Sequence, residues 1–117
     1  MISIKRGDVF YAVLPTGKNS IQGGLRPVVV VSNNSCNTYS PVITVVPLTT
    51  SRNKHKLPTH IKVLNKDVPN IRDSIALCEQ VMPIAKDSLS PDRVGKIPKV
   101  LMEKVERGVM TQLGVNE

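Results

Sequence analysis

Arg26 is the side chain in this sequence best placed for phosphate chemistry. It lies between a polar loop that ends in Gly23-Gly24 and an apolar β-branched run, Val28-Val29-Val30-Val31. Pro27 follows the arginine and biases its backbone toward extended geometry. A guanidinium held at the start of a rigid strand presents a planar, charged fork that matches phosphate oxygens. The alternative interpretation is an edge arginine that pairs with a carboxylate or lies in solvent.

Hydroxyl groups follow another predicted strand, residues 42–49, which contains Pro47. We expect this proline to mark a sheet edge or a β-bulge, and a bulge redirects the side chains after it. Those side chains are Thr49, Thr50 and Ser51. If the start of the valine-rich strand meets the end of this strand, the arginine and a hydroxyl can bind one phosphate together.

Other kinds of catalytic chemistry find less support. Two histidines could act as base and acid in RNA cleavage, but His55 lies in a basic loop and His60 begins a predicted strand. No carboxylates accompany them, so we expect no metal or other cofactor, and no glycine-rich nucleotide loop is present. Base-stacking modules use several aromatic side chains. This sequence offers only Phe10, Tyr11 and Tyr39.

The length and composition indicate one small domain. The chain has 117 residues, so we expect a single domain over residues 1–117. It has no apolar run long enough to span a membrane and no signal-peptide core at its start, so we expect a cytoplasmic protein with no membrane partner. Cys36 and Cys78 are too few for a disulfide framework or a zinc site, and Cys78 is expected to be a small buried hydrophobe.

Positive charge is concentrated in the first half of the chain. The net charge is +7, yet residues 9–66 contain no Asp or Glu at all. The cations of this segment are Lys18, Arg26, Arg52, Lys54, Lys56, Lys62 and Lys66. Such segregation predicts a polyanionic partner, with nucleic acid first and an acidic membrane second. The alternative is a solvated face with no partner.

Short predicted strands alternate with turns over most of the chain. We expect strands at residues 9–14, 27–32, 42–49, 59–63 and 73–81, with residues 82–85 as an extension or a short sixth strand. Residues 33–37 are expected to form a polar connection. This pattern favours a mainly β fold, a small and strongly curved sheet or barrel with helices at its rim.

Two helices are expected after the strands. Ser90-Pro91-Asp92 is typical of a helix start and predicts a short helix there. A longer helix is predicted from Pro98 to about Leu113, and Gly114 is a natural stop. Its apolar stripe is formed by Leu101, Val105, Val109 and Leu113, with Met102 beside it.

Five short motifs occur in one order and spacing over essentially the whole chain. They are Arg6-Gly7-Asp8-Val9, Gln22-Gly23-Gly24-Leu25-Arg26-Pro27, Pro47-Leu48-Thr49-Thr50, Leu57-Pro58-Thr59-His60 and Glu79-Gln80. Together they resemble the MazF/PemK (Kid) family, the toxins of bacterial type II toxin–antitoxin modules. The resemblance implies a strongly bent antiparallel sheet, an SH3-like barrel of the CcdB/MazF type, with short helices and a C-terminal helix. It also implies a homodimer.

The resemblance further implies a sequence-specific endoribonuclease that needs no metal and cuts single-stranded RNA, chiefly mRNA. The family's catalytic arginine falls on Arg26 and its catalytic threonine on Thr49. The RNA-contacting loop falls on residues 16–24, and a base-contacting glutamine on Gln80. With the basic and hydroxyl residues added, the candidate RNA-binding set is Lys18, Asn19, Ser20, Gln22, Gly23, Gly24, Thr50, Ser51, Arg52, Lys54, Lys56 and Gln80. The other implied partners are an acidic antitoxin and, for the toxin–antitoxin complex, operator DNA.

Ile21 departs from the family pattern. Many members carry Ser-Glu-Gln-Gly-Gly in this loop, whereas this chain has Ser20-Ile21-Gln22-Gly23-Gly24. Isoleucine neither takes a proton nor accepts a hydrogen bond, so a mechanism that needs the carboxylate does not transfer. Two alternatives therefore stay open: a non-catalytic nucleic-acid-binding regulator, and a gyrase-poisoning toxin of the CcdB type.

Overall fold

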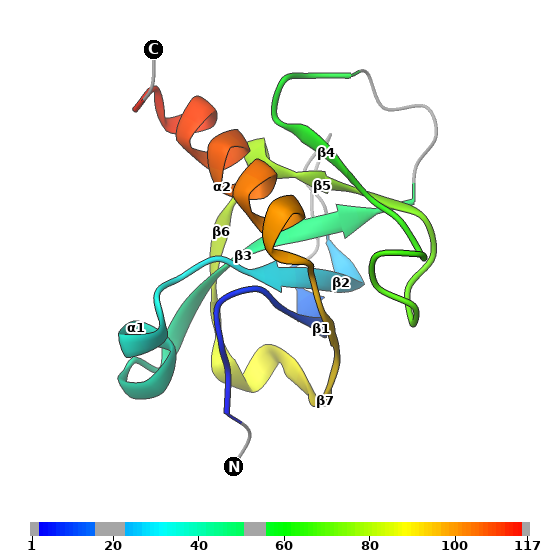
Figure 1. Ribbon diagram of the computed structural model, residues 1–117. Coiled ribbons are helices and arrows are strands. Elements are labelled where there is room, and N and C mark those ends of the chain that lie inside the picture. The colour runs from blue at the N-terminus through cyan, green and yellow to red at the C-terminus, as the bar shows by residue number, and fades with distance from the viewer. Residues whose placement is uncertain (1–2, 16–22, 51–55, 116–117) are drawn as a thin grey trace.

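The computed structural model describes residues 3–15, 23–50 and 56–115. Within these residues, seven strands form an antiparallel sheet in the order β4-β5-β3-β2-β1-β7, and β6 pairs with β3 outside this path. The strands are β1 Asp8–Leu14, β2 Gly24–Val30, β3 Val42–Thr49, β4 His60–Val63, β5 Ser74–Leu77, β6 Met82–Ala85 and β7 Leu89–Lys96. The helices are α1 Asn34–Tyr39 and α2 Lys99–Leu113, and the 3₁₀ turns are η1 Cys78–Gln80 and η2 Lys86–Ser88. In Figure 1, α2 crosses one face of the sheet.

Most predicted strands are present, with shifted ends. β3 and β6 have the expected bounds, whereas β2 begins at Gly24 and so includes Arg26, which the sequence placed before the strand. The predicted strand over residues 73–81 was too long, because η1 follows β5 directly. The polar connection after β2 contains the short helix α1, whose first turn is capped by the side chain of Asn33.

The short helix predicted at Ser90-Pro91-Asp92 is wrong. These residues belong to β7, which pairs with β1 and lies at the end of the strand order. A strand at a sheet edge accommodates a proline, because the missing N–H can face away from the ladder. The register between β1 and β7 shifts twice, and Arg93 reaches the buried Asp8 at 3.4 Å. Pairing with β1 therefore outweighs the local capping signal.

Pro47 marks neither an edge nor a bulge, contrary to the prediction. β3 is a central strand, and its register with β2 runs from Val30↔Val45 to Val28↔Pro47 without a shift. On its other side β3 pairs with β6 up to Val45 and with β5 from Leu48 onward. The proline thus lies where one partner strand replaces the other, a position at which a missing ladder donor is tolerated.

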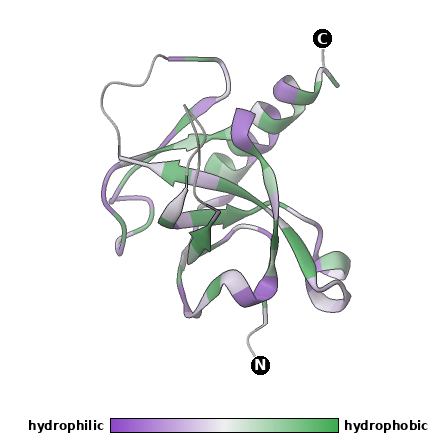
Figure 2. Ribbon diagram, turned by 180° about the vertical axis from the view of Figure 1, so that it is seen from behind, coloured by the Kyte–Doolittle hydropathy of each residue, from purple (hydrophilic) through white to green (hydrophobic). Residues whose placement is uncertain are grey.

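The pleat of the central strands divides the buried side chains between two cores. On the side of α2, Val9, Val29 and Leu48 pack with Cys78 and Val105. On the other side the second core is formed by Phe10, Ala12, Leu14, Val28, Val30, Ile43, Val45 and Ile84. Figure 2 shows the central strands mostly in the hydrophobic colour. Because both faces are buried, a near-continuous apolar run is required in these strands.

Helix α2 is confirmed, but its buried face differs from the predicted stripe. Val105 is fully buried and Leu101 and Val109 are half-buried, whereas Leu113 is 65% exposed. Met102 and Gly108 complete the buried face. Gly114 ends the helix with φ 72°, as predicted for a glycine cap. No helix of the described residues is long and apolar enough to cross a membrane.

Gly108 allows α2 to approach η1 closely, which yields a stability prediction. A Cβ atom at this position would lie 2.7 Å from the Sγ and 3.0 Å from the Cβ of Cys78. Overpacking of this kind costs about 1–3 kcal/mol, against about 1 kcal/mol gained in helix propensity. We expect Gly108→Ala to lower the unfolding free energy by up to roughly 2 kcal/mol in urea titration. In a Cys78→Ala background the same substitution should cost less, and equal costs would contradict this packing.

Candidate functional site

Arg26 and Thr49 lie on adjacent strands at the same end of the β2–β3 ladder. The last pair of that ladder joins Val28 to Pro47. Arg26 precedes Val28 by two residues and Thr49 follows Pro47 by two, so the two would stand opposite each other if the register continued beyond the last pair. Because side chains alternate along a strand, both lie on the sheet face that carries Val28. The strand arrangement is thus compatible with one anion bound by both groups.

The base of the Arg26 guanidinium is held by the turn before it. Nε donates a hydrogen bond to the carbonyl oxygen of Gly23 at 2.8 Å. Gly24 between them has φ 78°, a left-handed conformation that favours glycine. Among the described residues no carboxylate pairs with Arg26, which is half-buried. The two terminal nitrogens therefore carry charge and donors at the end of a fixed side chain.

Thr49 is nearly buried but borders an open cavity. Its residue exposure is 4%, and the cavity beside it has a volume of about 790 Å³. The exposed neighbour Thr50 lines the same cavity, as do the cations Lys62 and Arg72. Thr49 therefore contributes little surface to this cavity, and Arg26 is not among the described residues that line it.

The other candidate residues are placed less closely together. Gly23 and Gly24 lie beside Arg26, and Thr50 beside Thr49, whereas Lys56 is exposed before β4 and Gln80 lies in η1. Because Ile75 is the β5 partner of Thr49, Gln80 follows five residues further along the chain and is not beside Thr49 in the ladder. Candidates outside the described residues are Lys18, Asn19, Ser20, Gln22, Ser51, Arg52 and Lys54, together with Ile21 and His55.

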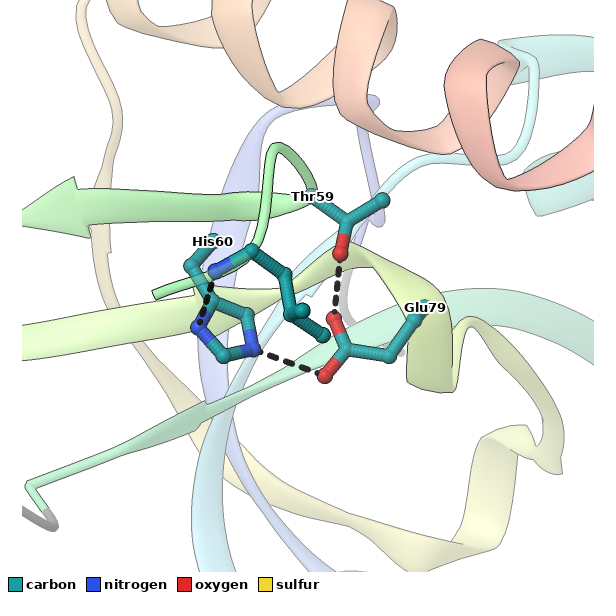
Figure 3. Close-up of polar contacts among 4 residues, drawn as sticks. Thr59, His60 and Glu79 are labelled. Atoms are coloured by element: carbon teal, nitrogen blue, oxygen red, sulfur yellow. Dashed lines mark hydrogen bonds and ion pairs between the residues drawn. The ribbon is translucent and has the colours of Figure 1, made fainter. Parts of the chain in front are cut away.

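A cluster of three polar side chains was not foreseen from the sequence. Glu79 accepts a hydrogen bond from the Thr59 hydroxyl at 2.9 Å, and its other oxygen lies 2.9 Å from Nε2 of His60 (Figure 3). The backbone N–H of Leu57 donates to Nδ1 of His60 at 3.3 Å. Nδ1 is therefore the acceptor, so Nε2 carries the hydrogen and donates it to Glu79. The motifs containing these residues were recognised, but their spacing did not indicate that they bond to each other.

Burial and hydrogen bonding have opposite effects on the cluster's carboxylate. Burial raises the pKa of Glu79, but hydrogen bonds from His60, the backbone and Thr59 lower it more, so the pKa falls below the usual 4.5. Glu79 is thus an anion near neutral pH. Next to it, burial and then the charge of Glu79 raise the pKa of the Cys78 thiol to about 12. Cys78 is the buried hydrophobe that the sequence predicted, and it is no nucleophile.

The described residues contain no group of three or more His, Cys, Asp or Glu side chains that could hold a metal ion. His60 is engaged with Glu79 and Leu57, and its side chain is only 6% exposed. Arg26, Lys62 and Arg72 supply positive charge in this region. Together with the Thr49 hydroxyl, they offer hydrogen-bond donors for a phosphate.

Comparison with known proteins identifies the family of this chain. A family model described as PemK-like, MazF-like toxin of type II toxin-antitoxin system matches residues 5–113. The chain belongs to this family. Endoribonuclease MazF of Staphylococcus epidermidis is 36% identical over 113 residues, which is 97% of this chain and 93% of that protein. Endoribonuclease EndoA of Bacillus subtilis (strain 168) is 38% identical over 112 residues, which is 96% of each chain.

Solved structures share the fold. The chain superposes on a mycobacterial endoribonuclease in complex with its cognate antitoxin with a TM-score of 0.79 at 24% identity, covering 97% of this chain and 98% of that one. MazF from Deinococcus radiodurans gives a TM-score of 0.81 at 16% identity, covering 97% and 99%. The family resemblance and the mainly β fold with an antiparallel sheet and a C-terminal helix are confirmed. Closure into an SH3-like barrel stays a prediction.

The lowered pKa of Glu79 predicts a pH-dependent contribution to stability. The ionised, hydrogen-bonded carboxylate stabilises the fold above the unfolded pKa of 4.5, and this contribution is lost as the pH falls through the lower folded value. Glu79→Gln should therefore be less stable than the wild type at about pH 7, and the difference should shrink at about pH 3. Urea unfolding at the two pH values measures it. The control is Glu103→Gln, which changes an exposed carboxylate of α2, and its unfolding free energy should stay near that of the wild type at both pH values. If Glu79→Gln is as strongly destabilised at low pH as at neutral pH, this explanation of the pH dependence is contradicted.

Proposed function

We propose that this chain is a toxin with sequence-specific endoribonuclease activity on single-stranded RNA, chiefly mRNA. Membership of the PemK-like, MazF-like family carries the proposal. It is supported by two relatives named endoribonucleases that match nearly the whole chain. Arg26 and Thr49 lie on adjacent strands, each two residues beyond the last pair of the ladder, and this placement is compatible with the chemistry. The family and its relatives favour RNA cleavage over a non-catalytic regulator or a gyrase poison.

The proposed reaction is a transesterification within the RNA. The 2′-oxygen beside the scissile bond attacks phosphorus while the bond to the 5′-oxygen breaks. The attacking hydroxyl loses its proton and the leaving oxygen gains one, which gives a 2′,3′-cyclic phosphate and a 5′-hydroxyl. Arg26 stabilises the charge that builds up on the phosphoryl oxygens, and Thr49 donates a hydrogen bond to the same group. A guanidinium remains charged throughout, so charge stabilisation is the role that we assign to Arg26.

RNA binding is proposed to use the positive half of the chain. The described part of this half includes the exposed Lys56, the start of β2 with Arg26, and Lys62 beside the Thr49 cavity. Arg72, outside this half, lines the same cavity. Ile21 stands where many family members carry Glu, so the proposed mechanism does not use a carboxylate at that position. Nucleobase specificity is assigned to Gln80 and to residues 16–24. The recognised RNA sequence is a separate question, which primer extension on a digested long RNA answers.

The proposed partners follow from the same charge. An acidic, partly disordered antitoxin would be attracted by the electrostatics that attract RNA. Relatives of this fold have been solved with their antitoxins, among them the mycobacterial endoribonuclease and MazF of Deinococcus radiodurans. We also propose that the toxin is a cytoplasmic homodimer and that its complex with the antitoxin binds operator DNA.

Replacing Arg26 tests the catalytic assignment. Loss of one donor that stabilises a transition-state anion costs about 2.7–4 kcal/mol, which is about 10²–10³ in rate. Arg26→Ala should therefore cut RNA at least 100-fold more slowly while its thermal unfolding stays close to the wild type. Arg107→Ala on the exposed side of α2 is the matched control and should cut normally. Wild-type cleavage by Arg26→Ala would end this assignment.

The substrate itself tests the attacking group. An RNA with a single deoxyribose at the cut position lacks the 2′-hydroxyl, so it should bind with near-normal affinity and stay whole. Cleavage of the all-ribose RNA should be unchanged by EDTA, because the proposed chemistry uses no metal. Gel analysis and affinity measurement on the two RNAs provide the comparison. Cleavage of the deoxy-substituted RNA would rule out 2′-hydroxyl attack, and binding without cleavage of either RNA would favour a regulator.

A further inference from the structure

Thr59, His60 and Glu79 join two parts of the chain that the proposed function places against RNA. Leu57, whose N–H donates to His60, directly follows Lys56. Glu79 directly precedes Gln80 in η1. The carboxylate between them is held at both oxygens, by the hydroxyl of Thr59 and by Nε2 of His60, each at 2.9 Å (Figure 3). We name these three residues the Glu79 clamp.

The clamp residues other than Glu79 have almost no surface. Thr59 is 6% exposed, and the side chain of His60 is also 6% exposed. Both ring nitrogens of His60 are used inside the protein, one by Leu57 and one by Glu79. Side chains so placed have too little surface to read an RNA base, so any effect on RNA must pass through a neighbour.

The neighbour that needs positioning is Gln80. It ends a three-residue 3₁₀ turn, whose backbone bond from Val81 N–H to the carbonyl of Cys78 is long at 3.3 Å. Short 3₁₀ turns have poor hydrogen-bond geometry and depend on their surroundings. Recognition of a base requires a side chain held within about 0.5 Å. On one side η1 is fixed by the contact of Cys78 with α2, and on the other by the clamp.

We propose that Thr59 and His60, acting through Glu79, are positioning residues that hold Gln80 for base recognition and so set the RNA preference of the toxin. The proposal rests on the proposed endoribonuclease function and on the role of Gln80 in it. The clamp does not take part in bond breaking, because its donors are already committed to Glu79. It therefore affects how the RNA is selected and bound, while Arg26 and Thr49 govern the chemical step.

Two substitutions of His60 separate its two hydrogen bonds. His60→Gln places an amide donor near the position of Nε2 and keeps the bond to Glu79, but it removes the acceptor for Leu57. His60→Asn places an oxygen near the position of Nδ1 and keeps the acceptor, but it loses Glu79. If the clamp acts through Glu79, the Asn variant should be impaired and the Gln variant should resemble the wild type. Thr59→Val and Thr59→Ser provide the same comparison for the hydroxyl.

The expected effect is on KM and on the choice of cut site. His60→Asn and Thr59→Val should raise KM for RNA about tenfold and relax the base preference at the cut, while kcat at saturating RNA stays within about threefold. His60→Gln and Thr59→Ser should stay within about twofold of the wild-type KM. Glu106→Gln, which breaks the hydrogen-bonded ion pair between Glu106 and Arg6 elsewhere in the fold, is the matched control and should leave both KM and preference unchanged.

A double-mutant cycle shows whether the effect passes through Gln80. In a Gln80→Ala background, His60→Asn should no longer change KM or base preference, because the residue that it positions is absent. The positioning role of the clamp would be overturned if the effects of His60→Asn and Gln80→Ala were independent, if only kcat fell, or if Glu106→Gln impaired the enzyme equally. None of these outcomes would contradict the nuclease assignment. A folded wild-type protein that cuts no RNA would overturn both. Thermal unfolding of every variant accompanies the kinetics.

Discussion

The register between β2 and β3 is the constraint on which the rest of the molecule depends. Continued beyond Val28 and Pro47, this register would set Arg26 opposite Thr49. The valine run alone does not determine the register, because after a one-residue slip another valine would still occupy each paired position. The same slip would turn Arg26 toward the face covered by α2, where burying an unpaired charge is costly. Gly7 N–H, which bonds to the carbonyl of Val30 at 2.8 Å, fixes the other end of β2. The charged residue of the candidate site thus helps to select the sheet that positions it.

Stability and chemistry are divided along the same strands. Val28 and Pro47 end the paired part of the ladder, and Val28 has no exposed surface. Two residues beyond this pair, each strand carries a polar side chain, Arg26 on β2 and Thr49 on β3, and Thr49 lines the cavity. A rigid core next to these strand ends limits the movement of Arg26 and Thr49, and the proposed charge stabilisation requires such preorganisation.

Local patterns predicted the elements that are determined locally. The apolar run of β3, the helix that ends at Leu113 and the cap at Gly114 were all visible in the sequence, because each depends on neighbouring residues. Ser90-Pro91-Asp92 was misjudged because pairing with β1 decides its conformation. The contact of His60 with Glu79 joins residues 19 positions apart, so no spacing rule indicated it. The opposition of Arg26 and Thr49 was expected only as a condition, and it stays a prediction, because the paired ladder ends at Val28 and Pro47.

Two carboxylates close to candidate site residues are held by hydrogen bonds that stabilise the fold. Asp73 lines the cavity beside Thr49, but its Oδ1 accepts the backbone N–H of Asn65 at 2.8 Å. Glu79 is held by Thr59 and His60. In the described part of the chain, neither Arg26 nor Arg72 forms an ion pair with a carboxylate. Hydrogen bonding leaves these carboxylates charged, but it directs them to the fold and not into an ion pair with either arginine. The net charge of +7 still favours an anionic ligand.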